Sequence, residues 1–432
     1  MKTYNQMSNA ELKKELAKLY KTRDAYKKKH LNLNMTRGKP APAQLDLCLG
    51  MNKVLINKED YISKDKIDCR NYGDMSGIYE CKKLLGDMCG ALPEQVIVAG
   101  NSSLRIMYDC IVHAMVKGVC GDKPFMQQKQ PIKWLCVVPG YDRHFAILEY
   151  LGIKMINIDL KKDGPDMDTV EKLVKKDPSI KGIWCVPQYA NPSGTSYGAK
   201  AVKRLAALKP AAKDFRIYWD NAYVVHHLYP NKQDKVLPIL AEAKKANNED
   251  IVYVFASTSK VSFAGAGIAC VACSEKNKKD LVANFNMETV GFDKVNQIRH
   301  VKYFKNLAGI KAHMKKHADI MRPKFEMVLD VLDKEVGDLK IAQYTRPYGG
   351  YFVSLNTLPG CATRTHALCK EMGVSLTPAG AAYPYHKDPQ DSHLRIAPSF
   401  PSVAEIRDAT KILALAIKIA TIEKKLKIHG RN

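Results

Sequence analysis

The feature that most constrains this chain is a series of short apolar runs that alternate with helix-like segments. The runs lie at 95–100, 134–139, 154–159, 182–187, 216–221, 252–257 and 268–273. Most are separated by amphipathic segments such as MDTVEKLVKK. Near-continuous apolar strands that alternate with helices predict a mostly parallel sheet with helices on both faces. We therefore expect an α/β fold with a seven-stranded sheet, and a ligand beyond the carboxyl ends of its strands.

The segments before and after this region have a different character. Residues 8–30 open with Ser8 and Glu11 at capping-box spacing, which predicts an N-terminal helix. From about residue 300 a long helical run rich in Lys and His is followed by shorter strands such as GGYFVSLN, which predicts a smaller α+β domain. The divisions we expect are 1–50 as an arm and part of the small domain, 51–300 as the large domain, and 301–432 as the rest of the small domain.

Composition and charge exclude several classes of protein. The chain has 432 residues, 46% of them hydrophobic, which suffices for a large core. It has no apolar run near the roughly 20 residues of a membrane span and no secretory signal, so we expect a cytoplasmic protein without a membrane partner. The net charge is +24, but the lysines are spread along helix-like segments without an Arg-rich block. We expect solvated faces rather than a nucleic-acid partner.

The twelve cysteines are scattered singly through strand-like and helix-like segments, which predicts buried free thiols rather than a disulfide framework. The one close pair, Cys270 and Cys273, lacks a second pair at zinc spacing. We interpret this pair as part of a buried strand and assign no metal.

Polar residues follow three of the predicted strands. The run 182–187 leads into NPSG with Asn191, the run 216–221 contains Asp220 near its end and is followed by Tyr223, and the run 252–257 leads into Lys260. A charged amine among hydroxyls and small residues at a strand end needs a partner. Because the carboxyl ends of parallel strands converge, we expect an amide, a carboxylate, a phenol and an amine in one site.

The run 95–100 ends at the turn GNSSLR, where a helix would present backbone N–H groups beside Ser102 and Ser103. A helix N-terminus of this kind is a phosphate site. A ligand that needs a lysine, a carboxylate, a phenol, an amide and a phosphate site is pyridoxal phosphate (PLP).

The order NPSG, D-x-x-Y, S-x-x-K and R-I-A-P-S resembles the class I aminotransferases of PLP fold type I, over nearly the whole chain from Arg37 to Arg395. The segments MTRGKPAPAQLDL, NYGDMSGIYE, VPGYDRHF, TSKVSFAGAG and DKVNQIRH resemble a divergent aspartate aminotransferase subgroup. That subgroup is related to the aminotransferase-like domain of certain bacterial regulators.

The resemblance implies a role for each residue at the strand ends. Lys260 would form a Schiff base with the cofactor and later carry a proton between the substrate and the cofactor. Asp220 would keep the pyridine nitrogen protonated, and Tyr223 and Asn191 would hydrogen-bond the ring hydroxyl. Asn191 could instead be only a turn residue.

The resemblance also implies residues that hold the rest of the cofactor and the substrate. Tyr141 would stack on the cofactor, or be an ordinary buried tyrosine, and Tyr72 would reach the partner's phosphate in a homodimer. Arg395 would bind the substrate α-carboxylate, with a surface arginine as the alternative. The remaining residues expected at the cofactor are Asn101, Ser102, Ser103 and Ser257, and those expected at a distal substrate carboxylate are Arg37, which could also be a turn arginine, and Gly38.

The sequence departs from the family pattern at one place. Many members carry an arginine a few residues after the lysine, where it binds the cofactor phosphate, and VSFAGAGIAC has none. The phosphate must then depend on the serines, on backbone N–H groups and on the partner subunit, through Asn296 or Gln297.

We therefore expect transamination of an L-amino acid, aspartate or glutamate, with a 2-oxo acid such as 2-oxoglutarate or oxaloacetate, in a ping-pong reaction. Aromatic or other donors and β-elimination remain open, whereas Arg395 argues against decarboxylation. A non-catalytic regulator is the other alternative. Only about 30 residues precede MTRGKP, too few for a winged DNA-binding domain.

Overall fold

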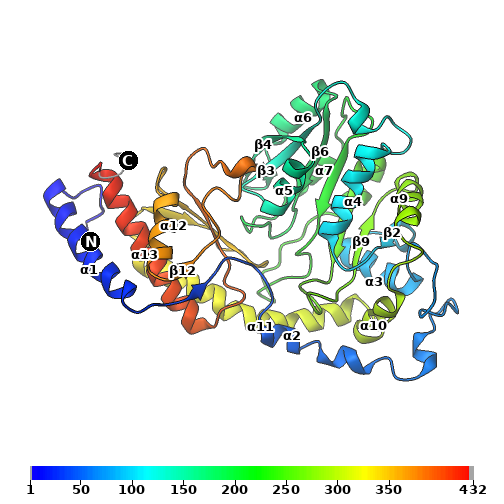
Figure 1. The fold of residues 1–432 in the computed structure, drawn as a ribbon, viewed down its shortest axis with the longest axis horizontal. Coiled ribbons are helices and arrows are strands. Elements are labelled where there is room, and N and C mark those ends of the chain that lie inside the picture. Colours follow the sequence, from blue (N-terminus) through cyan, green and yellow to red (C-terminus); the bar gives the residue numbers. More distant parts are fainter. Residues whose placement is uncertain (1, 428–432) are drawn as a thin grey trace.

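The computed structural model describes residues 2–427 and has a large mixed sheet, which lies in the right half of Figure 1. The strand order is β2-β9-β8-β7-β6-β3-β4-β5. The strands are β2 (Val96–Val98), β3 (Lys133–Val138), β4 (Lys154–Lys161), β5 (Gly164–Pro165), β6 (Ile180–Cys185), β7 (Arg216–Asp220), β8 (Val252–Ser257) and β9 (Ala269–Ala272). All seven predicted strands are present, and the two-residue β5 is an addition at the edge. Strands β3, β4, β6, β7 and β8 pair in parallel, whereas β9 runs antiparallel to both of its neighbours.

The sheet is buried on both faces, as its near-continuous apolar strands predict. In β3 and β7 alternate side chains belong to two different cores, with Leu135 and Trp219 on one face and Trp134 and Tyr218 on the other. This alternation follows from the two-residue period of a strand. Each strand must therefore be apolar along its length.

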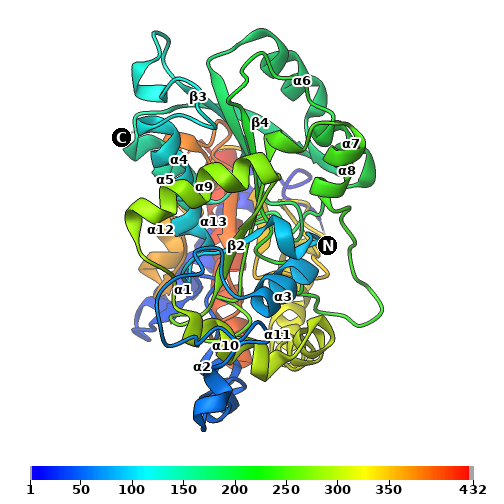
Figure 2. The ribbon, with the colours of Figure 1, turned by 90° about the vertical axis from the view of Figure 1, so that its right-hand side faces the viewer.

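Two sets of helices cover these faces, and Figure 2 shows them on opposite sides of the strands. One face packs against α3 (Tyr79–Cys89), α6 (Met167–Lys176), α7 (Ala199–Ala206) and α8 (Ile239–Lys245). The other packs against α4 (Ser103–Val116), α5 (Asp142–Tyr150) and α9 (Glu275–Glu288). The predicted α/β architecture is confirmed.

A second group of elements is built around a three-stranded antiparallel sheet, at the left of Figure 1. Its strands are β10 (Ala342–Tyr344), β11 (Val353–Thr357) and β13 (His393–Ile396). The helices of this group are α1 (Asn9–Lys27), α12 (Ala362–Glu371) and α13 (Val403–Lys425). Strands β1 (Leu33–Asn34) and β12 (Val374–Ser375) form a separate parallel pair. The predicted capping box begins α1, where Ser8 Oγ accepts from Glu11 N and Glu11 accepts from Ser8 N.

The helical run predicted after residue 300 is interrupted. Helix α10 (Lys294–Phe304) ends at Lys305, whose φ is 64°, and α11 (Leu307–Leu332) begins after it. The first part of α11 contributes Ile310 to the core of the large sheet, and its later part contributes Phe325 to the core of the small sheet. Because α11 contributes side chains to both cores, the structure does not divide the chain cleanly at residue 300. The predicted domains 1–50, 51–300 and 301–432 stay a prediction.

Short helices complete the chain. They are α2 (Pro42–Asp46), η1 (Leu49–Lys53), η2 (Lys58–Tyr61), η3 (Pro93–Gln95), η4 (Phe125–Gln127), η5 (Glu249–Ile251), η6 (Asp333–Gly337) and η7 (Pro384–His386). Of the Lys-rich tail, residues 428–432 lie outside the described part. Among residues 2–427, no helix combines the length and the apolar character needed to cross a bilayer.

All twelve cysteines are free, and all but Cys120 are buried. Cys270 belongs to the core on one face of the large sheet and Cys273 to the core on the other. The two thiols therefore belong to opposite faces of the sheet, with Cys270 inside β9 and Cys273 directly after it, so they do not form a joint metal site.

We expect Gly182→Ala to destabilise the fold. Gly182 pairs with Trp134 in the neighbouring strand, and a Cβ at residue 182 would meet Trp134 Cζ2 at 2.3 Å. Crowding of this kind in a packed core costs about 1–3 kcal/mol. The check is the urea midpoint of unfolding, with Gly265→Ala as the control, because a Cβ at exposed Gly265 meets nothing within 4 Å. Equal midpoints for the two variants would contradict the prediction.

Candidate active site

A cleft of about 510 Å³ opens beyond the carboxyl ends of β6, β7 and β8. It collects nearly every residue that the sequence predicted for the site. Those lining it are Arg37, Gly38, Ser102, Ser103, Tyr141, Asn191, Asp220, Tyr223, Ser257, Lys260 and Arg395. Asn101 and Tyr72 do not line it. The site thus lies where a mostly parallel sheet is expected to bind a ligand.

Lys260 follows β8 and places its amine above an aromatic ring. Its Nζ lies 5.0 Å from the ring centroid of Tyr223. Burial lowers the pKa of Lys260, and the negative charge of Asp220 opposes this shift. Beneath the lysine, the Nε2 atom of buried His226 lies 3.3 Å from the Lys260 carbonyl oxygen. The amine is therefore more readily neutral, and so more nucleophilic, than that of an ordinary lysine.

Asp220 is the last residue of β7 and is only 4% exposed. One carboxylate oxygen, Oδ2, lies 3.0 Å from His144 Nε2. The His144 ring stacks on Trp184 with centroids 4.2 Å apart. The other oxygen, Oδ1, is buried and accepts no hydrogen bond from any residue of the described chain. Because a buried carboxylate oxygen without a donor is costly, Oδ1 is suited to accept a proton donor from a ligand in the cleft.

The opposite part of the cleft is formed by the N-terminus of α4. Ser102 is the N-cap, and its Oγ accepts from Arg105 N at 3.4 Å. Ser103 begins the helix, and across from it Ser257 Oγ donates to Ser259 Oγ at 3.0 Å. Unpaired N–H groups and the helix dipole at this end favour an anion.

Three other residues considered for the cofactor phosphate make bonds elsewhere. Asn101 Nδ2 donates to the Gly265 carbonyl at 3.2 Å. Asn296 Nδ2 donates to the Gly267 carbonyl at 2.8 Å. Gln297 Oε1 accepts from the Ile78 amide at 3.0 Å. In this chain, these side chains hold loops rather than line the cleft.

Arg395 in β13 is 8% exposed, so it is not a surface arginine. Its Nη1 donates to Asp142 Oδ1 at 2.8 Å and to Asn191 Oδ1 at 3.3 Å, and its Nη2 donates to Thr377 Oγ1 at 3.0 Å. The guanidinium also lies 5.1 Å from the ring centroid of Phe352. It is held in one orientation with its charge turned into the cleft, which suits a planar carboxylate.

Arg37 and Gly38 lie at the edge of the cleft, where Arg37 is exposed. A Cβ at Gly38 would meet Phe352 Cζ at 2.5 Å, so Gly38 lets the arm pass close to that ring. Arg143, at the start of α5, is a second exposed arginine in the cleft.

Tyr72 lies away from the cleft and is 80% exposed. Its backbone carbonyl accepts from the Nζ of buried Lys294 at 2.8 Å. The segment is therefore held in place while the Tyr72 side chain projects outward. Its role at a partner's phosphate stays a prediction.

Sequence reasoning missed His144 and Asp142, although both lie in VPGYDRHF. That segment was considered for Tyr141, which caps α5, whereas the next residues form the first turn of the helix. An apolar strand followed, after a three-residue turn, by Asp, Arg and His in the first turn of a helix is the signal that could have identified them. Thr377 had no such signal, because its contact with Arg395 is purely tertiary.

The chain is similar in sequence and in structure to known aspartate aminotransferases. The sequence model of the family described as aspartate amino-transferase matches residues 6–429. A relative from Mycolicibacterium smegmatis is 43% identical over 397 residues, which are 91% of this chain and 92% of the relative. An aspartate aminotransferase of Corynebacterium glutamicum is 41% identical over 400 residues, 93% of this chain and 92% of that protein. The crystal structure of an aspartate transaminase from C. glutamicum is similar at a TM-score of 0.94 with 39% identity, and covers 98% of this chain and 99% of its own.

We expect the lowered pKa of Lys260 to be measurable in protein freed of bound carbonyl compounds. The pH dependence of Lys260 labelling by an amine-reactive reagent should have a midpoint below 10.5, and Asp220→Asn should lower it further, because the carboxylate raises the pKa. Peptide mass spectrometry measures the labelling, with exposed Lys172 as the internal reference for the reagent. A midpoint at 10.5 or above, or a rise in Asp220→Asn, would contradict this.

Proposed function

Because the chain belongs to the aspartate amino-transferase family, we propose that it transfers the amino group of L-aspartate or L-glutamate to a 2-oxo acid, with pyridoxal 5′-phosphate as its cofactor. The family expected from the sequence is confirmed, and the protein is an aminotransferase. What we propose beyond the family is the identity of the amino donor, of the 2-oxo acid acceptor and of the cofactor. The observation that carries it is the buried, unpaired Asp220 Oδ1 in the same cleft as Lys260.

The residues of the cleft fit pyridoxal phosphate. An N–H on the pyridine ring would give Asp220 Oδ1 the donor that it lacks. Lys260 Nζ is an amine of lowered pKa that can attach to the aldehyde. The N-terminus of α4 with Ser102 and Ser103, together with Ser257, offers donors to the phosphate. When bound, pyridoxal phosphate withdraws electrons from the substrate α-carbon and so makes its proton removable.

Lys260 and Asp220 would divide the work at the reacting atoms. Lys260 Nζ, once displaced by the substrate amine, would take the proton from the substrate α-carbon. It would then donate that proton to the cofactor carbon that carried the aldehyde. Asp220, held by His144, would accept a hydrogen bond from the ring N–H and so favour the protonated ring nitrogen. The phenol of Tyr223, buried near Lys260, would donate to the ring hydroxyl, because burial raises the pKa of Tyr223 well above its usual value and keeps the proton in place.

Arg395 would bind the substrate α-carboxylate with its two parallel donors. Asp142 bonds the same guanidinium at its Nη1 and is partly exposed, so a substrate carboxylate would compete with it. A retained carboxylate favours transamination over decarboxylation.

Aspartate and glutamate carry a second carboxylate, and the exposed Arg37 and Arg143 at the cleft would neutralise it. The C. glutamicum relatives named for aspartate support this choice. The outward position of Tyr72 supports a homodimer in which Tyr72 contacts the partner's cofactor.

The test of the function is the production of oxaloacetate and L-glutamate from L-aspartate and 2-oxoglutarate by the PLP-loaded protein. Lys260→Ala should lower turnover by about 10⁴-fold or more, because both the attachment point and the proton carrier are lost. Exposed Lys172→Ala is the matched control and should leave turnover unchanged. Retained activity in Lys260→Ala would refute the mechanism. If the protein turned over only aromatic amino acids, the proposed donors L-aspartate and L-glutamate would be wrong.

Arg37→Ala tests the dicarboxylate pocket. A lost ionic hydrogen bond is worth about 1.5–3 kcal/mol, so kcat/KM for L-aspartate should fall by about 10- to 100-fold. The value for L-alanine, which has no distal carboxylate, should stay within about twofold. Steady-state kinetics with both donors decides this, with Arg143→Ala measured in parallel. If both donors lose equally, Arg37 is not a specificity residue.

A further inference from the structure

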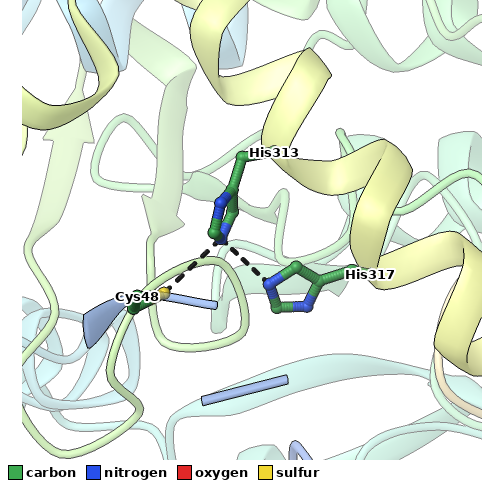
Figure 3. Close-up of side chains that lie close together, drawn as sticks. All are labelled: Cys48, His313 and His317. Carbon is green, nitrogen blue, oxygen red and sulfur yellow. Dashed lines mark hydrogen bonds between the residues drawn. The ribbon is translucent and has the colours of Figure 1, made fainter. Parts of the chain in front are cut away.

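A second group of chemically versatile side chains lies where the N-terminal arm, the loop after Lys260 and helix α11 meet. Figure 3 shows Cys48 from the arm and the rings of His313 and His317 from α11 turned toward one another. All three are buried, and their possible ligand atoms lie within 4.8 Å of one another. We propose that Cys48, His313 and His317 bind a zinc ion, with the carbonyl oxygen of Val261 as the fourth ligand.

The distances suit a tetrahedral site after small adjustments. His313 Nε2 lies 3.4 Å from Cys48 Sγ, 3.0 Å from His317 Nε2 and 3.0 Å from Val261 O. Zinc bonds of about 2.0–2.3 Å to nitrogen and sulfur place tetrahedral ligands about 3.4–3.6 Å apart. Histidines four residues apart on one helix face are a recurrent zinc-binding arrangement.

The protons available in the cluster do not satisfy all of its contacts. Gln44 Oε1 accepts from the Ala41 amide, so Gln44 Nε2 is the donor to His317 Nδ1 at 3.1 Å. A neutral His317 then carries its proton on Nε2 and donates to His313 Nε2. His313 Nε2 is left without a proton while it faces the Val261 carbonyl at 3.0 Å. The Cys48 thiol lies 3.5 Å from that carbonyl and 3.4 Å from His313 Nε2, and its single proton can be donated to only one of them. The other tautomer of His313 would place two N–H groups face to face, 3.0 Å apart.

A cation satisfies these converging lone pairs together. Zinc binding removes the thiol proton from Cys48 and moves the proton of His317 to Nδ1. The Gln44 amide must then turn so that its oxygen accepts from Nδ1, at the cost of its bond from Ala41 N. Gln44 is thus the outer ligand partner that would tune the site.

The ligand types select zinc among common divalent ions. A thiolate and two imidazoles suit a borderline-soft ion, whereas magnesium and calcium prefer carboxylate and carbonyl oxygens. The cluster contains no carboxylate. Its position beside Val261 gives the metal a structural role, because it ties the loop that carries Lys260 to both the arm and α11.

The test uses untagged full-length protein with its cofactor, equilibrated with zinc chloride and then desalted. We expect about one zinc per chain by elemental analysis, and a loss of more than about tenfold in zinc affinity in Cys48→Ser. Cys369→Ser, a buried thiol elsewhere, is the matched control and should retain the metal. X-ray absorption of the zinc-loaded wild type should give one sulfur at about 2.3 Å and nitrogens at about 2.0–2.1 Å.

A second variant tests the outer partner. In Gln44→Glu a carboxylate can accept from both Ala41 N and His317 Nδ1, so zinc affinity should rise by about tenfold or more. The proposal is overturned if the wild type holds no more zinc than Cys48→Ser, if the absorption spectrum lacks sulfur, or if Gln44→Glu does not bind zinc more tightly. None of these readouts depends on transaminase activity.

Discussion

The active site depends on keeping one amine and one carboxylate poorly solvated in the same cleft. Burial lowers the pKa of Lys260, and the negative charge of Asp220 raises it again in part. This balance requires that the carboxylate stay in place, which His144 ensures by its bond to Oδ2 and its stacking on Trp184. The parallel sheet meets these demands, because it delivers both residues from neighbouring strands that end at one edge.

Strand positions and most of the residues that line the cleft could be predicted because the signal is local. A strand buried on both faces must be apolar along its length, so a polar residue at its end, such as Asp220, stands out. The eighth strand, Gly164–Pro165, was not predictable, since two residues carry no period. The break at Lys305 was also missed, because its left-handed φ has no glycine to announce it.

Contacts between distant segments explain what the sequence could not reveal. Asp142 meets Arg395 across 253 residues, and Cys48 meets His313 across 265. The spacing of His313 and His317 is visible in the sequence, but nothing near Cys48 marks it, because the cysteine meets the histidines only when the arm reaches α11. The absence of an arginine after Lys260 could be read directly from the sequence. Which groups would bind the cofactor phosphate instead depends on the orientation of α4, which the sequence does not reveal. Asn296 and Gln297 bond to backbone groups of their own chain, and their role at the partner's phosphate stays a prediction.

Helix α11 links the two hydrophobic cores, since Ile310 packs in one and Phe325 in the other. Between them lies Pro323, which has no N–H to bond to the preceding turn. Loss of packing in either core would leave half of the helix without support. The two sheets are therefore coupled in unfolding through α11, and the backbone hydrogen-bond ladder of this helix lacks one bond at Pro323.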